Sequence, residues 1–561
     1  MPQLKGYENI GFVNGCNEEN NCISYLKKHM ELFPKKTALR WTSKGSVDKP
    51  HLSIDFETFY EKVNRTAQGL KDLGLKKGDC VIIFLPMSVE LYQSMFAVMQ
   101  IGAISVFLDS WARRTHLGAS ADTVNPKAMI SFEGAFEFCK EVPEIDSIPL
   151  KISAFPTAKP GFKLLSELAS SPRLTELTAV EGEDTALITF TTGSSGRPKG
   201  ANRTHQFLSA QHKALDLTIP YTDQDSDLPA FPIFSLNNLA SGVTTIIPAV
   251  DIGAPTAQDP LVLISQMKAC HINCTTLSPS MLVEIARYCA KENIQLPFLR
   301  RVVTGGAPIS NDDLRAFKKI APNTEIWVLY GSTEVEPIAH IEANEILHQE
   351  NAEEKEGVNV GHFAEGLAVK FLKINRGNIE FKNSTQWKDL EVNEGDVGEI
   401  AVSGLHVCKS YYNYPEATKT TKVIDSTGAV WHRTGDLGYQ DEKGQLWLVG
   451  RVHNAIQRND RWLFPVKAEI VLKRLAFAHR VAFLGIPDTT LGERTVAVVA
   501  PHQKDVLKNA APYVHQIREA LGREGIPVDE IHLVESIPMD PRHHSKVEYA
   551  VLREQLKSAA A

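Results

Sequence analysis

Two periods of apolar and polar residues alternate along the first part of the chain. Residues 56–73 place apolar side chains every three or four positions, which predicts an amphipathic helix. Short apolar runs at 80–85 and 104–108, bounded by turn residues, predict buried strands. The alternation returns with a helical pattern at 280–291 and an apolar run at 299–304. We therefore expect an α/β fold in which helices cover parallel sheets.

The pattern changes beyond about residue 391, where short strand signals separated by turns replace the helical spacing. The runs at 398–402 and 445–449 each predict a short strand of a β-rich subdomain. Beyond Gly450, a helical pattern at 466–475 leads into a small α/β unit of about a hundred residues. This last unit is large enough to be a separate lid.

The length of the chain, 561 residues, exceeds what one hydrophobic core usually serves, so we expect at least two domains. The first, residues 1–450, would contain two α/β subdomains and the β-rich subdomain from about residue 391. The second, residues 451–561, would be a small α/β lid domain at the C-terminus.

Composition narrows the class of partner. Hydrophobic residues make up 43% of the chain and charged residues 23%, as in an ordinary globular protein. The formal net charge of −7 at pH 7 speaks against a broad basic surface, so we expect no nucleic-acid partner. Residues 1–15 lack the basic and apolar parts of a signal peptide, and Glu90 and Gln93 interrupt the apolar stretch at 87–108. We expect a cytoplasmic protein with no transmembrane segment.

The eight cysteines are scattered along the chain and form no recognisable disulfide framework, which fits a reducing compartment. Cys270, His271 and Cys274 are spaced like half of a zinc site. No matching pair of cysteine or histidine residues accompanies them elsewhere in the sequence. We therefore predict no zinc site.

One polar segment directly follows a predicted strand at 186–190. It reads Thr191-Thr192-Gly193-Ser194-Ser195-Gly196-Arg197-Pro198-Lys199-Gly200. Glycines let backbone N–H groups wrap an anion, the hydroxyl groups donate further hydrogen bonds, and Lys199 adds positive charge, so the segment suits phosphate. Its spacing is not that of the G-x-x-x-x-G-K-[ST] loop. A flexible surface loop would have a similar composition, so the segment alone leaves both interpretations open.

Further motifs follow this segment in a fixed order. They are Gly305-Gly306-Ala307-Pro308, Tyr330-Gly331-Ser332-Thr333-Glu334, Thr434-Gly435-Asp436 and Gly450-Arg451, with Lys546 near the end. Each one alone is an ordinary turn, loop or exposed charge, but independent chance matches rarely fall in sequence. Together they resemble the adenylate-forming superfamily, which includes acyl-CoA synthetases, luciferases and the adenylation domains of peptide synthetases.

This resemblance implies an enzyme that binds ATP and Mg²⁺, with a large N-terminal domain and a mobile lid hinged near residue 453. It implies that Lys546, Glu334 and Thr192 are catalytic, and that Glu334 and Thr192 hold the metal. The residues that it places against the nucleotide are Thr191, Thr192, Gly193, Ser194, Ser195, Gly196, Lys199, Gly305, Gly306, Ala307, Pro308, Tyr330, Gly331, Ser332, Thr333, Glu334, Asp436, Arg451 and Lys546.

The implied reaction joins two anions, because the carboxylate of a small-molecule acid attacks the α-phosphorus of ATP and pyrophosphate leaves. Negative charge builds on the phosphate oxygens, so positive charge must be supplied. Lys546 would pair with the α-phosphate or with the attacking carboxylate. Asp436 would accept hydrogen bonds from the ribose hydroxyls, and Tyr330 would stack on the adenine.

The segment after Arg451 departs from the family pattern. The family carries an Ile-Lys-x-x-Gly-x-Arg stretch along the path of an incoming thiol, preceded by a hinge acid or lysine. Here His453 stands at the hinge, Gln457 replaces the lysine, Asp460 the glycine and Trp462 the arginine. A side chain in place of that glycine would obstruct the thiol's path. A shift of one or two residues in the alignment would also explain the mismatch.

The terminal motif departs as well, reading Arg542-His543-His544-Ser545-Lys546. Arg-His-x-x-Lys resembles the olefin β-lactone synthetase branch of the superfamily, whose members need no CoA. In that chemistry a 3-hydroxy acid is adenylated, and its own hydroxyl displaces AMP to close a four-membered lactone. We therefore favour β-lactone formation, with fatty acyl-CoA ligation as the alternative, so the use of CoA stays open.

The acyl substrate is indicated only indirectly. Ser235 stands where the family often carries a histidine that orients the acid. The neighbouring apolar residues are Phe231, Phe234, Leu236 and Leu239. They suggest a fatty or 3-hydroxy fatty acid, although such a run is also usual in a core.

Two hypotheses from other classes stand beside adenylation. A non-catalytic nucleotide-binding protein would keep the fold without turnover, but the intact Lys199, Glu334 and Asp436 speak against it. A kinase-like enzyme or ATPase would produce ADP, and the absent Walker spacing speaks against that. The sequence identifies no pathway partner.

Overall fold

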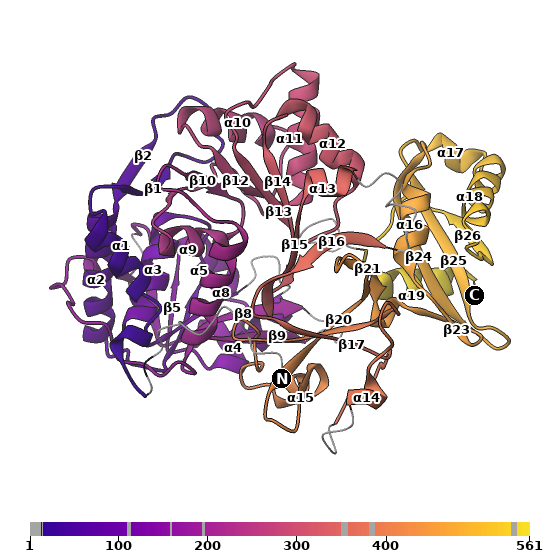
Figure 1. Cartoon of the computed structure of the whole chain (residues 1–561). Helices are drawn as coiled ribbons and strands as arrows, with labels where there is room; N and C mark the ends of the chain where they lie inside the picture. The colour runs from indigo at the N-terminus through magenta and orange to yellow at the C-terminus, as the bar shows by residue number, and fades with distance from the viewer. Residues whose placement is uncertain are drawn as a thin grey trace. The chain divides into compact units, whose positions relative to one another are not determined.

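The computed structural model describes residues 13, 15–108, 114–157, 160–192, 197–348, 357–380, 387–539 and 547–560. The chain forms two compact units, each built from separated segments (Figure 1). Unit 1 comprises Met1–Asn344, Ala364–Ala368 and Ser403–Lys422, and unit 2 comprises Glu345–Phe363, Val369–Val402 and Val423–Ala561. The boundary predicted between residues 450 and 451, and the hinge near residue 453, remain predictions.

The first sheet of unit 1 explains why its strands read as uninterrupted apolar runs. Its strand order is β7 (Lys163–Leu164), β6 (Leu150–Ser153), β5 (Ala128–Ser131), β3 (Cys80–Ile83), β4 (Ile104–Phe107), β8 (Thr185–Thr192) and β9 (Pro198–Thr204). Neighbouring strands are parallel except β8 and β9, which are antiparallel. In β3, Val81 and Ile83 enter one buried cluster while Cys80 and Ile82 enter another. Successive side chains point to opposite faces, so both faces are covered.

Helices supply the apolar side chains on both faces of this sheet. The cluster that contains Val81 includes side chains of α1 (Ser24–Leu32), α2 (Phe56–Asp72), α3 (Val89–Gln100) and α7 (Leu165–Leu168). The cluster that contains Ile82 includes side chains of α4 (Arg114–Val124), α5 (Glu133–Cys139) and α6 (Pro143–Asp146). Helix α2 begins where the periodicity predicted, because Asp55 caps it by accepting a 2.7 Å hydrogen bond from the Thr58 N–H.

The second sheet of unit 1 runs in the order β15 (Val335–Glu342), β14 (Glu325–Ser332), β13 (Arg301–Gly305), β12 (Cys274–Leu277), β10 (Ser226–Pro229), β11 (Thr244–Ile246), β1 (Thr37–Trp41) and β2 (Leu52–Asp55). The pairs β14–β15 and β1–β2 are antiparallel and the inner pairs are parallel. The accompanying helices are α8 (His205–Thr218), α9 (Pro232–Ala240), α10 (Asp259–Ala269), α11 (Pro279–Lys291), α12 (Asn311–Ile320), α13 (Ala343–His348) and α15 (Pro415–Thr421). The predicted α/β class with parallel sheets is confirmed.

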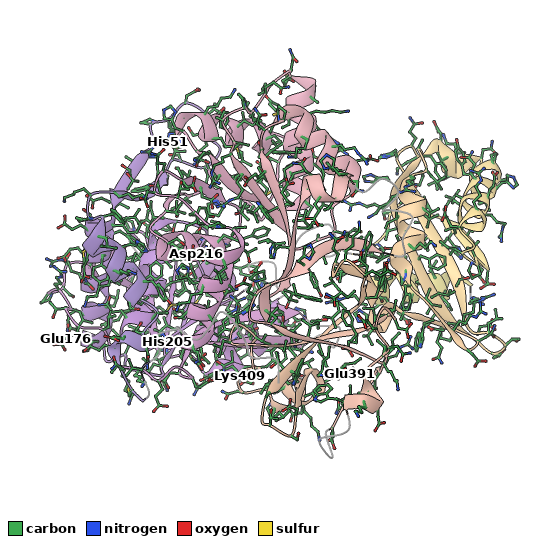
Figure 2. All side chains as sticks on the ribbon, viewed as in Figure 1. His51, Glu176, His205, Asp216, Glu391 and Lys409 are labelled. Carbon is green, nitrogen blue, oxygen red and sulfur yellow. The ribbon has the colours of Figure 1, made fainter. Side chains whose placement is uncertain are left out.

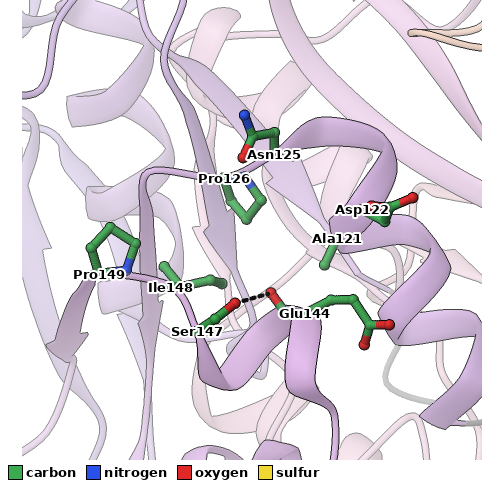
Figure 3. Close-up of a pocket in the computed structure, with 8 residues that line it drawn as sticks. All are labelled: Ala121, Asp122, Asn125, Pro126, Glu144, Ser147, Ile148 and Pro149. Atoms are coloured by element: carbon green, nitrogen blue, oxygen red, sulfur yellow. Dashed lines mark hydrogen bonds between the residues drawn. The ribbon is translucent and has the colours of Figure 1, made fainter.

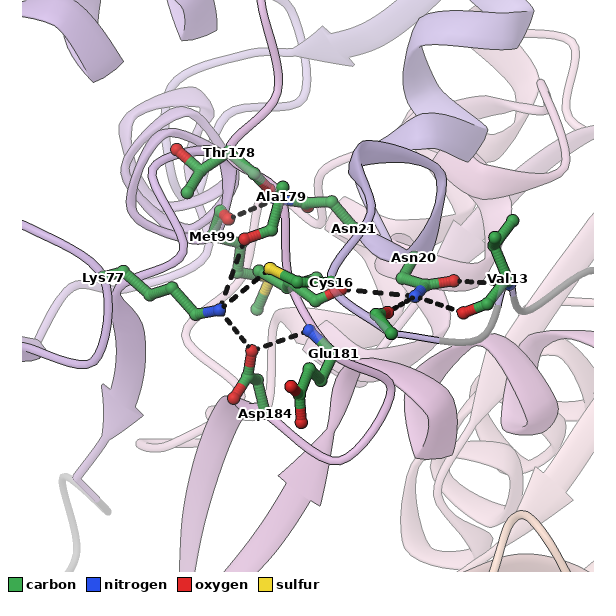
Figure 4. A network of polar contacts seen from close by, with 12 residues as sticks. Val13, Cys16, Asn20, Asn21, Lys77, Met99, Thr178, Ala179, Glu181 and Asp184 are labelled. Carbon is green, nitrogen blue, oxygen red and sulfur yellow. Dashed lines mark hydrogen bonds and ion pairs between the residues drawn. The ribbon is translucent and has the colours of Figure 1, made fainter.

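A polar network ties the N-terminal segment of unit 1 to the start of β8 (Figure 4). The Lys77 ammonium pairs with Asp184 at 2.7 Å and lies 3.6 Å from the Cys16 sulfur. Asn20, in the short helix η1 (Glu18–Asn20), donates hydrogen bonds to the carbonyls of Val13 and Val180. The network therefore fixes a segment that carries little apolar surface of its own.

Unit 2 contains a β-rich part, whose first strands precede residue 391. Its strand order is β17 (Ala368–Leu372), β18 (Gly398–Ser403), β20 (Val430–Gln440), β21 (Leu446–Arg451) and β16 (Val358–Phe363). Strand β19 (Lys422–Ile424) pairs with β20, and α14 (Trp387–Leu390) is a short helix. The pairs β18–β20, β20–β21 and β16–β21 are antiparallel. The turn signals of the sequence therefore mark a meander of short strands.

The last part of unit 2 is the small α/β structure predicted after Gly450. Its sheet has the order β23 (Arg461–Leu463), β22 (Ile456–Arg458), β25 (Gly492–Pro501) and β24 (Ala478–Asp488), with β26 (Glu530–Leu533) parallel to β25. The helices are α16 (Pro465–Lys473), α17 (Asp505–Lys508), α18 (Ala511–Arg523) and α19 (Tyr549–Ala560). Residues of α16 and α18 pack against one face of the sheet, and residues of α19 pack against the other. None of the helices described is long and apolar enough to cross a bilayer.

Candidate active site

The predicted phosphate segment begins and ends in two paired strands. Thr191 and Thr192 end β8 while Pro198 and Lys199 begin β9, with Thr191 opposite Lys199. Gly200 also lies in β9, where a Cβ would approach the Ile188 side chain to 2.8 Å. The sequence prediction of a loop through residue 200 was wrong at both ends, because strand pairing continues as far as Thr192 and resumes at Pro198. The side chain of Thr192, and Gly193, Ser194, Ser195 and Gly196, lie outside the described residues.

Strand β9 leads directly into α8, which begins at His205 (Figure 2). Thr204 caps the helix by accepting a 3.1 Å hydrogen bond from the Phe207 N–H. The His205 Nδ1 accepts a 3.2 Å hydrogen bond from the Cys22 N–H, so the imidazole is neutral. Burial lowers the pKa of His205 to about 4. The strand that carries Lys199 is therefore anchored by a buried histidine at its far end.

The Gly305 and Tyr330 motifs meet at one edge of the second sheet. Strands β13 and β14 are parallel, and Gly305 pairs with Leu329. A Cβ at Gly305 would lie 2.5 Å from the Leu329 carbonyl oxygen, and Gly306 has a φ of +82°, which favours glycine. Ala307 and Pro308 continue the turn after β13. The carboxyl ends of parallel strands are where α/β sheets usually bind ligands, and the role of both motifs at this position remains a prediction.

Glu334 lies in the turn between two antiparallel strands. Tyr330, Gly331 and Ser332 end β14, and Val335 begins β15 opposite Ser332. The Ser332 hydroxyl accepts a 3.2 Å hydrogen bond from the Glu334 N–H, which tightens the turn. The half-buried carboxylate of Glu334 accepts a 2.7 Å hydrogen bond from the Tyr411 hydroxyl. Burial and this neighbouring carboxylate raise the pKa of Tyr411 far above its usual value, so the phenol stays a neutral donor.

Tyr411 also lies beneath the predicted phosphate-binding lysine. The Lys199 Nζ is 5.7 Å from the centre of the Tyr411 ring, and the Lys422 Nζ is 5.4 Å from it. Lys422 is buried, and burial lowers its pKa. Lys199 and Glu334, which the sequence predicted to bind the same nucleotide, therefore both contact the Tyr411 side chain. Sequence reasoning missed Tyr411 and Lys422, and the only signal was an aromatic run at 411–414.

A buried arginine supports the turn that carries Glu334. The Arg203 guanidinium donates hydrogen bonds of 3.2 and 2.7 Å to the Thr333 carbonyl oxygen. Burial raises the pKa of Glu336 to about 7, although Arg203 opposes that shift. Arg203 follows the phosphate segment by a few residues, and sequence reasoning missed it because its partner lies 130 positions away.

The donor chemistry near Glu334 can be compared with what Mg²⁺ needs. No group of three or more histidine, cysteine, aspartate or glutamate side chains suited to a metal ion occurs in the part of the chain that the structure describes. In nucleotide sites, Mg²⁺ is usually held by one or two carboxylates together with phosphate oxygens, rather than by an all-protein cage. The single carboxylate of Glu334, close to Lys199, fits that second arrangement.

In unit 2, Asp436 pairs with Arg451 across two strands. Asp436 of β20 lies opposite Arg451 of β21, and the Arg451 Nε donates a 2.7 Å hydrogen bond to the Asp436 Oδ1. The Asp436 N–H donates to the Thr434 hydroxyl at 3.0 Å, and that hydroxyl donates to the Ile400 carbonyl at 2.9 Å. Gly435, with a φ of +72°, permits the irregular backbone between them. The motif predicted to bind ribose is thus part of a strand.

The segment that departs from the family pattern forms a hairpin. Gln457 of β22 pairs with Trp462 of β23, and Asn459 and Asp460 form the turn. The left-handed residue is Asn459, with a φ of +52°, whereas the sequence alignment put the glycine equivalent at Asp460. The Arg376 guanidinium lies 5.4 Å from the centre of the Trp462 ring. Asn tolerates this conformation better than other non-glycine residues, so the turn forms without glycine.

His453, the predicted hinge residue, lies in the short helix η3 (Val452–Asn454). Desolvation by its neighbours lowers its pKa to about 4 although the side chain is exposed, and the nearby charges of Arg451 and Arg553 act in the same direction. His453 is therefore a neutral side chain at the start of the predicted lid. Lys546 and its neighbours Arg542, His543 and His544 lie outside the described residues.

Ser235, at the predicted acid-orienting position, is fully buried in α9. The Tyr92 hydroxyl donates a 2.7 Å hydrogen bond to it. Phe231 and Phe234 pack in a small apolar cluster with Val303 and Leu329, whereas Leu236 and Leu239 contribute to the main core. The four apolar residues suggested to contact the acyl chain therefore pack in two different apolar clusters.

A surface pocket lies elsewhere in unit 1, between α4 and α6 (Figure 3). Asp122 of α4 and Asn125 just after it line one side, and Glu144 of α6 and Ser147 just after it line the other. None of the residues predicted for the nucleotide is among its lining residues.

Comparison with known proteins agrees with this arrangement. A family model described as AMP-binding enzyme matches residues 26–412. The olefin beta-lactone synthetase of Stenotrophomonas maltophilia (strain K279a) is 29% identical over 443 residues, which cover 78% of this chain and 79% of that protein. A long-chain-fatty-acid–CoA ligase of Mycobacterium tuberculosis (strain CDC 1551 / Oshkosh) is 26% identical over 496 residues, covering 88% of this chain and 91% of that protein.

The fold also matches a solved structure. The o-succinylbenzoate CoA synthetase of Bacillus subtilis, solved in complex with its acyl-adenylate intermediate, superposes with a TM-score of 0.74 at 20% identity. The match covers 95% of this chain and 97% of that one. At this identity the likeness concerns the fold.

Proposed function

Because this chain belongs to the AMP-binding enzyme family, we propose that it uses ATP to activate a fatty or 3-hydroxy fatty acid and then closes the product to a β-lactone. The resemblance predicted from the ordered motifs is confirmed, and with it the class of the protein, an enzyme that forms acyl-adenylates. The substrate, the acceptor and the role of each residue are the parts that we propose.

In the first step, a carboxylate oxygen of the acid bonds to the α-phosphorus of ATP, and the bond to pyrophosphate breaks. The main support for this proposal is that Lys199 and Glu334 both contact Tyr411. The Lys199 ammonium lies over the Tyr411 ring, and the Glu334 carboxylate accepts a hydrogen bond from the Tyr411 hydroxyl. Thr191 and Lys199, with Gly193 to Gly196, would hold the departing phosphates, and Lys546 would neutralise charge at the α-phosphate. Tyr330 and the Gly305 to Pro308 turn would hold the adenine.

Glu334 and Thr192 are the proposed ligands of Mg²⁺, which would neutralise charge on the phosphate oxygens when bound. Asp436 would accept hydrogen bonds from the ribose hydroxyls, and Arg451 would keep the Asp436 carboxylate in place. We also propose residues 451–561 as the lid domain, with its hinge near His453.

In the second step, the 3-hydroxyl oxygen of the acyl-adenylate bonds to the acyl carbon. The bond to AMP breaks, AMP leaves with its electron pair, and the hydroxyl proton passes to a base or to solvent. The internal nucleophile is held close to the carbon it attacks, so no thiol channel is needed. The 29% identity to an olefin beta-lactone synthetase supports this acceptor, as does the Gln457 and Trp462 hairpin.

The alternative acceptor is CoA, which would give a fatty acyl-CoA. The similarity to the long-chain-fatty-acid–CoA ligase, which covers 88% of this chain, favours that alternative. Both reactions share the first step and differ only in the group that displaces AMP.

The test incubates the full chain with ATP, Mg²⁺ and a panel of fatty and 3-hydroxy fatty acids, with and without CoA. We expect AMP and pyrophosphate with either acid class, and a product lighter than the 3-hydroxy acid by one water. That product should lose CO₂ on heating, as a β-lactone does and an unsaturated acid does not. If a thioester forms only when CoA is present, the acceptor is CoA and not the hydroxyl of the substrate. If ADP is the nucleotide product, the proposed adenylation step is wrong.

A further inference from the structure

Residues 406–414, named here the Tyr411 segment, lie between β9 and the turn that carries Glu334. None of these residues belonged to the predicted site. The segment begins with buried His406, whose Nε2 lies 3.1 Å from the Pro337 carbonyl oxygen, and it leads into α15. Lys409 within it pairs with Glu183 at 2.5 Å (Figure 2). The segment is therefore anchored to parts of unit 1 that are distant in sequence.

One side of the segment holds both the backbone and the side chain of Glu334. The Cys408 N–H donates a 2.7 Å hydrogen bond to the Glu334 carbonyl oxygen, next to a bridge between Val335 and Val407. The Tyr411 hydroxyl donates a 2.7 Å hydrogen bond to the Glu334 carboxylate. Fixing the backbone alone leaves three side-chain torsions of a glutamate undetermined. The hydrogen bond from Tyr411 acts on the carboxylate itself.

The other side of the segment is joined to the strand that carries Lys199. The Tyr412 N–H donates a 2.8 Å hydrogen bond to the Gly200 carbonyl, and the Asn202 N–H donates a 3.1 Å hydrogen bond to the Ser410 carbonyl. Tyr411 forms an isolated bridge with Ala201. Because β9 also carries Lys199, the same tyrosine connects the predicted phosphate lysine to the predicted metal carboxylate.

The Tyr411 ring is itself held in place. Tyr411 is 5% exposed, and its N–H donates a 2.9 Å hydrogen bond to the Thr418 hydroxyl of α15. The Lys422 ammonium donates a hydrogen bond of 2.5 Å to the Cys408 carbonyl and lies above the ring. A buried aromatic ring with few alternative rotamers is a more rigid support than an exposed, flexible side chain.

We propose that Tyr411 is a positioning residue for the bound metal and nucleotide: its hydroxyl orients the Glu334 carboxylate and its ring fixes the place of Lys199. This inference rests on the proposed function of Glu334 as a Mg²⁺ ligand. An ionised carboxylate has about four lone-pair positions, so it can accept the tyrosine hydrogen bond and still coordinate a cation. Without the tyrosine hydroxyl, the carboxylate would lose this contact, and binding of the metal would have to supply the ordering that the contact provides, so the affinity for the metal would fall.

The test compares Tyr411→Phe with Tyr412→Phe. Tyr412→Phe is the matched control, because it removes the neighbouring hydroxyl, which lies 3.7 Å from the Cys80 sulfur and is not bonded to Glu334. In pyrophosphate exchange, we expect Tyr411→Phe to raise the Mg²⁺ concentration for half-maximal rate about tenfold, as for the loss of one hydrogen bond to a charged group. The rate at saturating Mg²⁺ should recover to within about threefold of the unaltered enzyme.

A second readout does not depend on activity. Calorimetry of ATP binding, with Mg²⁺ and with EDTA, measures how much the metal strengthens nucleotide binding. We expect Tyr411→Phe to reduce that strengthening about tenfold, to leave ATP binding in EDTA unchanged, and to have no effect in a Glu334→Gln background. Thermal unfolding of each variant measures any loss of folding separately.

Wild-type Mg²⁺ dependence in Tyr411→Phe would overturn the inference, and so would an equal loss of ATP binding in EDTA. So would an undiminished Tyr411→Phe effect in the Glu334→Gln background, because the tyrosine would then act independently of the carboxylate. Failure of the proposed function gives a different result, namely no acid-dependent exchange by the unaltered chain. In that case, the calorimetric comparison still decides whether Tyr411 positions Glu334 for the metal.

Discussion

Glu334 and Asp436 are both predicted to contact the nucleotide, and their surroundings differ. Tyr411, 77 positions further along the chain and 5% exposed, donates a hydrogen bond to Glu334. Asp436 is paired with Arg451, its direct neighbour on the adjacent strand, and the Arg451 side chain is 51% exposed. The first carboxylate is positioned by a buried partner distant in sequence, and the second by an exposed partner in strand register.

The exposure of each partner indicates how strongly its contact is expected to contribute. An exposed ion pair is screened by water and salt and is typically worth less than 1 kcal/mol. A hydrogen bond from a buried neutral group to a carboxylate is worth about 1.5–3 kcal/mol, because its loss leaves the charge poorly compensated. We therefore expect the surroundings of Glu334 to tolerate substitution less well than those of Asp436.

The largest effect is expected at Lys546, which lies outside the described residues. Lys546→Ala should slow acid-dependent pyrophosphate exchange at least roughly a hundredfold, because a positive charge is lost where negative charge builds up. Lys557→Ala, which alters a half-exposed lysine paired with Glu554, is the matched control and should have no effect. Near-normal exchange in Lys546→Ala would contradict the role proposed for Lys546.

Glu334→Gln should reduce pyrophosphate exchange about thirtyfold and weaken its dependence on Mg²⁺, because an amide is a poor ligand for that ion. The exchange rate should be measured over a range of Mg²⁺ concentrations. Glu176→Gln, at an exposed position, is the control. If Glu334→Gln kept the full response to Mg²⁺, the metal would have other protein ligands. Glu334 would then not be the more sensitive of the two carboxylates.

Asp436→Asn should raise the KM for ATP about tenfold and change kcat by less than about threefold, since ribose contacts are made equally before and during the reaction. Arg451→Gln should have a smaller effect, about threefold on the same KM, because the pair is exposed. Steady-state kinetics at saturating acid measure both. A large fall in kcat for Asp436→Asn would mean that the Asp436–Arg451 pair acts on the chemical step. It would contradict the expectation that the surroundings of Asp436 tolerate substitution better than those of Glu334.

His205 is expected to affect stability and not activity. Its pKa is about 4 in the folded chain and 6.5 unperturbed, so the unfolded chain binds the extra proton more readily. Stability from this group is complete above pH 6.5 and is lost as the pH falls toward 4, with about 2 kcal/mol lost by pH 5. Urea unfolding at pH 7, 6 and 5 should show that loss and show less of it in His205→Asn. Parallel pH profiles for the two proteins would refute the assignment.

The sequence was sufficient for features that depend on local pattern. The apolar run at 80–85 contains the strand Cys80–Ile83, which is buried on both faces, and the helix predicted at 56–73 was placed to within one residue. The pairing of Asp436 with Arg451 could also have been predicted from the sequence, because both residues lie in one antiparallel strand pair, β20 and β21. In each of these cases, the determining interactions lie within a few residues or one hairpin.

The surroundings of Glu334 could not be obtained in the same way. Tyr411, Arg203 and Lys422 come from elements that meet only after two sheets and their connections have formed. Nothing in the spacing of an aromatic run at 411–414 identifies which carboxylate it will contact. The sequence also did not predict that both ends of the phosphate segment lie in strands. Glycine and hydroxyl residues are typical of loops, but pairing between β8 and β9 determines the structure at these ends.

The discontinuity of unit 1 has a consequence for protein synthesis. Residues 403–422 complete this unit, but the ribosome reaches them only after it has made the unit 2 segments at 345–363 and 369–402. The 77 positions between Glu334 and Tyr411 take about 4 to 15 seconds to translate at roughly 5–20 residues per second. During that time the nascent chain carries β9 and the Glu334 turn without the segment that joins them. The contacts that join Glu334 to Tyr411 can therefore form only after the intervening part of unit 2 has been synthesised.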